Sequence, residues 1–168
     1  MHGQEAREFA RIAAALTDQV EVKDIVSTLA ALAALCVRSE HLGLILRTGA
    51  DRPVEAGSTD LAVAEADHLQ VVLGEGPSWP CLTGTLPFLV GDLESAARWP
   101  NWHSHVAVLG FRRYAAARLS AAGATLGVLT IYSEARSGLV SSWESSVQLL
   151  ATHASRAITL ASLGGSGW

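Results

Sequence analysis

The sequence has few of the basic residues that a nucleic-acid-binding chain needs. Among its 12 Lys and Arg residues, Lys23 is the single lysine, Arg112–Arg113 is the one basic pair, and the formal net charge is −4. A chain that binds nucleic acid by itself presents a basic stripe or arm. We therefore expect no direct binding of nucleic acid by this chain.

Cysteines and long apolar runs are scarce too. Cys36 lies in an apolar helical pattern and Cys81 in a proline-containing loop, so the two thiols suggest neither a disulfide framework nor a metal site. Cys36 is expected to be a small core residue. The most apolar stretch, Leu29–Val37, is far shorter than the ~18 residues of a membrane span. The polar start Met1–Glu5 is no signal peptide. These features predict a cytoplasmic protein with no membrane contact.

Motifs of enzyme active sites are missing as well. The sequence contains no Gly-x-Ser-x-Gly elbow, no phosphate-binding glycine loop and no His-Glu-x-x-His pair. Gly74-Glu75-Gly76 lacks the preceding strand that a dinucleotide fingerprint requires. A thiol peroxidase-like role for Cys81 stays open, although no His or Arg stands at a suggestive spacing. We expect no enzymatic activity.

The residues that are present predict one α+β domain. The chain has 168 residues and is 49% hydrophobic, enough for a single core. Residues 1–19 are expected to form an N-terminal helical extension, residues 20–163 the domain, and the glycine-rich residues 164–168 a flexible tail. Periodicity predicts helices over 5–16, 22–37, 61–72, 100–109 and about 143–163. It predicts strands over 41–48, 53–57 (an edge), 86–90, 111–120 and 125–133.

The stretch His68–Leu82 organises this pattern. Gly74 ends a helix, Gly76-Pro77 specifies a bend, and Trp79 and Cys81 flank the next proline. So much constrained backbone around an aromatic ring and a thiol suggests the wall of a binding site. The alternative is a rigid loop whose Trp79 closes the edge of the core.

Six motifs appear in an order that is more specific than any one of them. They are Leu69-Gln70 with Leu73-Gly74-Glu75-Gly76-Pro77, Val90-Gly91-Asp92-Leu93, Arg98-Trp99-Pro100, Gly110-Phe111-Arg112, Leu126–Ser133 and Leu149–Ala154. With them, residues 20–162 resemble the GAF family of sensor domains. More narrowly, they resemble the GAF domains that precede ANTAR RNA-binding modules in actinobacterial antitermination regulators. Ser78 stands where relatives usually have cysteine, and Thr130 where they tend to have asparagine. No ANTAR module follows the last helix, so RNA binding is expected of a longer parent or a partner.

The resemblance implies a central antiparallel sheet of about five or six strands. Amphipathic N- and C-terminal helices would cover one face, and short helices and loops would cover a pocket on the other. The candidate ligand-binding residues are Trp79, Cys81, Trp99, Trp102, His103, Arg113 and Tyr114. Arg112 and Arg113 point to opposite sides of their strand, and which of them faces the pocket stays open. Trp102 could instead dock its helix on the sheet.

Two functions follow from the resemblance. The first is a sensor that binds an unidentified small molecule or transmits a signal through a homodimer formed by its N- and C-terminal helices. The second is a ligand-free GAF scaffold that acts as a dimerisation or protein-interaction module. A haem ligand among His68, His103 and His105 is not singled out, and a GAF-type methionine sulfoxide reductase would need cysteines closer together than Cys36 and Cys81. No metal and no tightly bound cofactor are expected.

Overall fold

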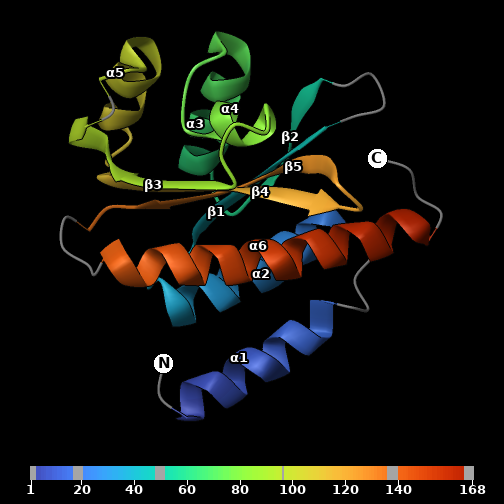
Figure 1. The fold of residues 1–168 in the computed structure, drawn as a ribbon. Helices are drawn as coiled ribbons and strands as arrows, with labels where there is room; N and C mark the ends of the chain where they lie inside the picture. Colours follow the sequence, from blue (N-terminus) through green and yellow to red (C-terminus); the bar gives the residue numbers. More distant parts are fainter. Residues whose placement is uncertain (1–2, 17–20, 48–51, 96, 136–139, 165–168) are drawn as a thin grey trace.

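The computed structural model describes residues 3–16, 21–47, 52–95, 97–135 and 140–164, with the backbone alone for 140–142. It contains one five-stranded sheet in the order β2-β1-β5-β4-β3, in which all neighbours are antiparallel (Figure 1). The strands are β1 His41–Arg47, β2 Pro53–Ser58, β3 Phe88–Asp92, β4 Arg113–Ala121 and β5 Ala124–Ser133. The predicted α+β fold and the edge position of β2 are confirmed.

Helices pack in two layers below the sheet as it is drawn in Figure 1. The helices α2 (Val22–Cys36) and α6 (Val140–Leu163) lie against the sheet, and α1 (Gly3–Ala15) lies outside them. Alternate strand residues such as Leu44, Ala117 and Ile131 join the buried faces of these helices in the main core. The prediction of N- and C-terminal helices on one face is therefore confirmed, with α1 as an additional outer layer.

The opposite face of the sheet carries an upper layer of three helices: α3 (Leu61–Leu73), α4 (Ser78–Leu82) and α5 (Pro100–Val108). Asp60 caps α3 by accepting the Val63 N–H, and Gly74 ends it with a left-handed φ of 66°. A short 3₁₀ turn, η2 (Leu93–Ser95), links β3 to the segment before α5. Apart from the edge strand β3, the described segments between α3 and β4 thus build the cover of this face.

Three segments differ from the sequence-based prediction. The strand predicted over 111–120 begins two residues later, at Arg113. The segment after Pro77, predicted as a loop, forms the short helix α4, because Pro80 stands in the first turn, where a missing N–H costs no helical hydrogen bond. The strand predicted over 86–90 lies two residues later. Gly91 and Asp92, predicted to turn away, pair with Tyr114 and Arg113 of β4.

Part of the predicted C-terminal tail lies outside the described residues. Residues 165–168 of the predicted flexible tail are among those not described. Within the described ranges, no helix has both the length and the apolar character needed to cross a bilayer.

Candidate functional site

Five aromatic rings fill the interior between the sheet and the upper layer. They are Trp99, Trp102, Phe111, Tyr114 and Tyr132, all buried in one cluster. Trp99, Trp102 and Tyr114 meet edge to face, with ring centroids 5.9–6.0 Å apart. Phe111 stacks on Tyr132 at 4.8 Å. Such pairs add attraction beyond the area they bury, so the cluster fastens α5 to the sheet.

A buried polar network borders this aromatic cluster. The Asp67 carboxylate accepts hydrogen bonds from the Tyr132 hydroxyl (2.7 Å), the Thr130 hydroxyl (2.8 Å) and the Gln70 amide (3.3 Å). Gln70 also donates to the Tyr132 hydroxyl at 2.9 Å. Gly43 of β1 makes room for the carboxylate, because a Cβ there would overlap Asp67 Oδ2. Helix α3 is thereby bonded to β5 through one acidic side chain, which lies over Gly43 of β1.

The ionisation of Asp67 is strongly perturbed. Burial raises its pKa from 3.8 to about 7, although the three hydrogen bonds to the carboxylate act in the opposite direction. Burial together with the nearby Asp67 carboxylate raises the pKa of the Tyr132 phenol well above 10. The network therefore holds an acid that changes charge near neutral pH, inside a shell of fixed donors.

The glycine-proline motif after α3 is held by Gln70 and Glu75. Gln70 accepts the Ser78 N–H at 2.7 Å through its side chain and the Trp79 indole N–H at 2.7 Å through its backbone carbonyl. Glu75 accepts the backbone N–H groups of Asn101 and Trp102, each at 3.0 Å, at the start of α5. A carboxylate at a helix N-terminus satisfies donors that have no partner within the helix. This motif is thus a joint between α3, α4 and α5.

Trp79 and Cys81 lie on α4, beside the aromatic cluster and not in it. Trp79 is half-buried and points its indole N–H back to α3. Cys81 is fully buried with Ile45, Ala116 and Val128. Burial raises the pKa of the Cys81 thiol to about 11, so it is protonated at neutral pH.

The side chains of His103 and Arg113 are not part of the aromatic cluster. His103 is half-buried on α5, and its backbone N–H bonds to Trp99. Arg113 lies under the sheet on the side of α6. Its Nε donates to Asp92 at 3.1 Å, and its guanidinium lies 4.8 Å from the centre of the Trp143 ring. Of the two arginines whose orientation was open, Arg113 therefore faces away from the upper layer.

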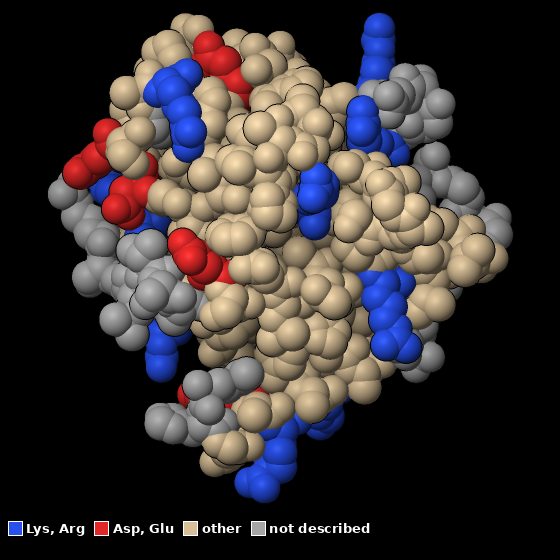
Figure 2. Space-filling model, viewed as in Figure 1, with Lys and Arg blue, Asp and Glu red and all other residues tan. Residues whose placement is uncertain are grey.

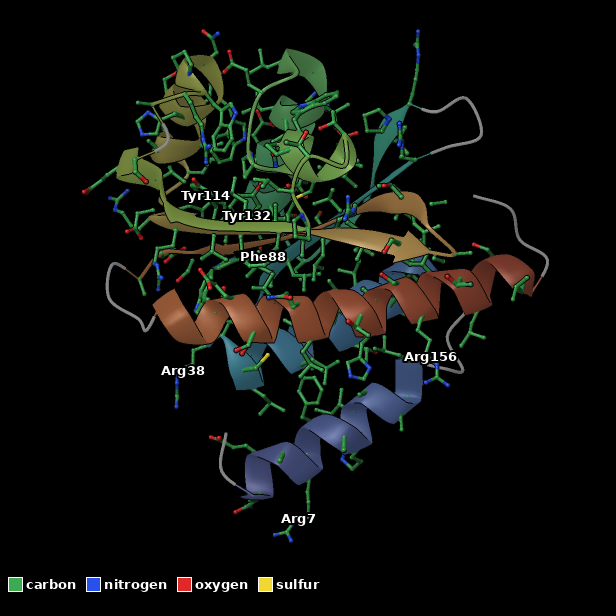
Figure 3. All side chains as sticks on the ribbon, viewed as in Figure 1. Arg7, Arg38, Phe88, Tyr114, Tyr132 and Arg156 are labelled. Carbon is green, nitrogen blue, oxygen red and sulfur yellow. The ribbon has the colours of Figure 1, made fainter. Side chains whose placement is uncertain are left out.

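The structure thus brings three of the seven candidates into one cluster, namely Trp99, Trp102 and Tyr114. Figure 3 labels Tyr114 and Tyr132 on the upper side of the sheet, and Phe88 on the side of α6. Trp102 is 0% and Tyr114 2% exposed, so the chain's own rings occupy the interior where a ligand was expected. The sequence reasoning missed Asp67 as a site residue. The sequence signal for Asp67 was its position on one helix face with Val63, Ala66 and Gln70, at the spacing of a buried stripe.

Comparisons with known proteins agree on the fold. No protein-family model and no curated protein matches the sequence. Among solved structures, the GAF domain of an Acinetobacter phosphoenolpyruvate-protein phosphotransferase is similar, with 17% identity, a TM-score of 0.65, and 99% of each chain covered. A free methionine-R-sulfoxide reductase from Neisseria meningitidis, solved with its substrate, has 19% identity and a TM-score of 0.65 over 98% of this chain and 95% of that one.

The GAF domain of A. aeolicus nlh2, solved in an inactive state, has 16% identity and a TM-score of 0.64. The similarity covers 93% of this chain and 96% of that one. At such identities the similarity establishes architecture alone. The five-stranded antiparallel sheet between two helical layers is the fold of GAF domains.

Proposed function

We propose that this chain is a regulatory module of a signalling protein that acts by pairing with a second copy of itself. The observation that carries the proposal is the filled interior of the upper layer, where Trp102, Tyr114 and Tyr132 are each at most 2% exposed. A pocket that opens for a small ligand is usually concave and largely preformed. The filled interior favours the interaction module over a sensor that binds its ligand at these rings.

The outer side of α6 supplies a surface for pairing. Leu149, Leu160 and Leu163 are 39%, 38% and 79% exposed, and their spacing of 11 and 3 residues places them on one side of the helix. We call these three residues the α6 stripe. Exposed apolar residues aligned along a helix favour a self-complementary contact across a two-fold axis.

Light scattering of the purified chain tests this pairing. We expect a dimer, and we expect Leu149→Glu to convert it to a monomer with an unchanged circular dichroism spectrum. The matched control is Leu61→Glu, since Leu61 is 89% exposed on α3, across the sheet from α6. A wild-type monomer at high concentration would contradict the proposal. Leu29 and Ile158 are unsuitable for this test because they are buried in the core.

We further propose that neither cysteine of this module is catalytic. Cys36 is half-buried against the core below the sheet, and Cys81 is buried on the opposite side. Burial raises the pKa of each thiol to about 11. Little thiolate forms at neutral pH, and the thiolate is the reactive species. Ellman's reagent at pH 8 should label the native chain slowly and the denatured chain fully. Rapid labelling of Cys81 in the native chain would contradict this expectation.

The motif series resembling GAF–ANTAR regulators supports a role in antitermination control in the cytoplasm. On this proposal RNA binding belongs to a separate module or partner, because the chain has 16 acidic and 12 basic residues. A gel-shift assay with a structured RNA hairpin should show no complex at micromolar protein and low salt. A stable complex under those conditions would overturn this assignment of roles.

A further inference from the structure

The side-chain amide of Gln70 joins the buried acid of α3 to the first turn of α4. Its Nε2 donates to the Tyr132 hydroxyl at 2.9 Å and to Asp67 Oδ1 at 3.3 Å. Its Oε1 accepts the Ser78 N–H at 2.7 Å, and Ser78 is the first residue of α4. Gln70 is 1% exposed, so water does not compete for these bonds. A change at Asp67 can therefore reach α4 through one amide group.

The hydrogen bonds around Asp67 are those of an ionised carboxylate. Tyr132, Thr130 and Gln70 all donate to it. A protonated carboxyl has a proton of its own to donate and needs an acceptor. The Tyr132 oxygen is 2.7 Å from Oδ1, but its proton already points at Asp67 and it receives the Gln70 amide. A proton on Oδ1 would face the phenol proton, so protonation requires that the phenol proton find another acceptor.

A half turn of the Gln70 amide supplies that acceptor. With Oε1 facing Tyr132, the Asp67 carboxyl donates to the phenol oxygen and the phenol donates to Gln70. The turn exchanges an oxygen for an NH₂ group of similar size. It therefore needs no extra room in a tightly packed place, where a Cβ on Gly76 would lie 2.5 Å from Oε1. The NH₂ group then faces the Ser78 N–H, donor against donor, and this bond is lost.

The Ser78 hydroxyl suits the turned amide. Its oxygen is buried and has no hydrogen-bond partner among the described residues. A buried hydroxyl without a partner costs stability. Once the Gln70 NH₂ group faces Ser78, this oxygen can accept from it. Ser78 thus has a donor for one orientation of the amide and an acceptor for the other.

We propose that Asp67, Tyr132, Gln70 and Ser78 form a proton-operated switch that sets how firmly α3 holds the start of α4. When Asp67 is ionised, Gln70 Oε1 holds the Ser78 N–H. When Asp67 is protonated, the amide turns and the first turn of α4 loosens. Helix α4 has no charged residue, and its part of the face viewed in Figure 2 is tan. Its attachment therefore depends on hydrogen bonds and apolar packing.

The groups around Asp67 set the pH at which the switch operates. Burial is the main cause that raises the pKa of Asp67 to about 7. The titratable groups that face Asp67 are the Tyr132 phenol of β5 and the Glu55 carboxylate of β2, which raises this pKa further. Glu55 is itself paired with His68 of α3. The turned state is expected below about pH 7, and the state with the Ser78 bond above it.

Nuclear magnetic resonance of the whole chain from pH 5 to pH 9 tests the switch. We expect the Gln70 side-chain amide and the Ser78 backbone amide to titrate together, with a midpoint near pH 7. After correction for its intrinsic pH dependence, hydrogen exchange of the Ser78 amide should be about 5- to 10-fold faster at pH 6 than at pH 8, the effect of losing one hydrogen bond. Invariant Gln70 resonances would place the proton on Oδ2 beside Thr130 and overturn the switch.

Asp67→Asn should fix the turned state, because its NH₂ group supplies the donor that a protonated carboxyl has. The Ser78 amide of this variant should be weakly protected at both pH values. Glu65→Gln, an exposed change on the same helix, is the matched control and should titrate like wild type. A Ser78 amide that still titrates near pH 7 in folded Asp67→Asn would contradict the proposal.

Ser78→Ala covers the case in which Asp67→Asn does not fold. It keeps the backbone N–H and removes only the acceptor of the turned state, so the midpoint should fall by about 0.5–1 pH unit. A hydroxyl with a merely structural role would leave the midpoint unchanged, and that result would overturn the part assigned to Ser78. The Leu149→Glu variant should titrate like wild type, because the switch does not depend on the proposed pairing of two copies.

Discussion

At the scale of single residues, Asp67 is the group whose surroundings change its chemistry most. It is 1% exposed, and its two carboxylate oxygens accept hydrogen bonds from Tyr132, Thr130 and Gln70. A buried carboxyl loses hydration, and the bonds from neutral donors only partly replace it. The network therefore specifies how α3 sits on the sheet, and this arrangement costs stability once Asp67 is ionised.

The stability of the protein should depend on pH through Asp67. Its pKa is raised from 3.8 to about 7, so between these values the native state holds a proton that the unfolded state has lost. The contribution of Asp67 is then full below about pH 4 and is lost as pH rises to about 7. Relative to wild type, Asp67→Asn should gain up to about 4 kcal/mol in unfolding free energy from pH 4 to pH 8. Urea unfolding at several pH values measures it, with the exposed Asp24→Asn as control. If the difference in unfolding free energy between Asp67→Asn and wild type stays constant from pH 4 to pH 8, the raised pKa of Asp67 is refuted.

Gly43 is the residue that makes space for this carboxylate. In Gly43→Ala the new methyl group would overlap Asp67 Oδ2 and lie 2.7 Å from Thr130 Oγ1. We expect a loss of about 1–3 kcal/mol in unfolding free energy, as for other overpacked sites. Gly3→Ala is the matched control, because a methyl group there meets nothing within 4 Å and alanine is the better helix former. Equal melting temperatures for the two variants would contradict this account.

At the scale of elements, α5 depends on a residue from another segment. Pro100 begins the helix, Trp99 precedes it without a side-chain cap, and Glu75 from the loop after α3 accepts two of its first N–H groups. These bonds lower the pKa of the Glu75 carboxyl. The stabilisation of α5 by the Glu75 carboxylate is therefore present above pH 4.5. It is lost as the pH falls through the lowered pKa of Glu75.

Glu75→Ala should loosen the first turn of α5 while leaving the sheet intact. Hydrogen exchange should show faster exchange of the Asn101 and Trp102 amides, and lowering the pH of the wild type below 4 should destabilise the same turn. Glu75→Gln should have a smaller effect, because the amide oxygen still accepts a hydrogen bond without the charge. Unchanged protection of α5 in Glu75→Ala would show that the cap is dispensable.

At the scale of the whole molecule, α1 forms the outermost layer. It packs mainly on α2 and reaches α6 through Phe9. Phe9 is 5% exposed and meets the His153 ring edge to face at 5.5 Å. A helix of 13 residues is marginal by itself, so its order depends on this docking.

Phe9→Ala should release α1 without unfolding the domain. We expect a loss of about 3 kcal/mol of docking free energy, with rapid hydrogen exchange across residues 3–15 and unchanged protection of β5. Arg7→Ala, an exposed change on the same helix, is the control and should keep α1 protected. Uniform loss of protection throughout the chain would show instead that α1 and the domain unfold together.

Much of this architecture could be predicted from local patterns. The alternation in 111–120 placed Arg113, Ala115 and Ala117 on one face, as the structure shows, because a strand turns its side chains by a period of two whatever its neighbours are. Helix α4 and the later start of β3 were not predicted. Neither segment has a periodic signal of its own, and the contacts of Ser78 with Gln70 and of Gly91 with Tyr114 cross between elements.

The sequence by itself determined the order of helices and strands, the faces of the long hairpin and the motif series of the GAF fold, since these depend on spacings along the chain. The tertiary structure decided which candidates share a site. It filled the interior at Trp102 and Tyr114, placed Arg113 beneath the sheet, and buried Asp67 against Tyr132. These outcomes depend on packing between segments far apart in the chain, and local spacing contains no information on that packing.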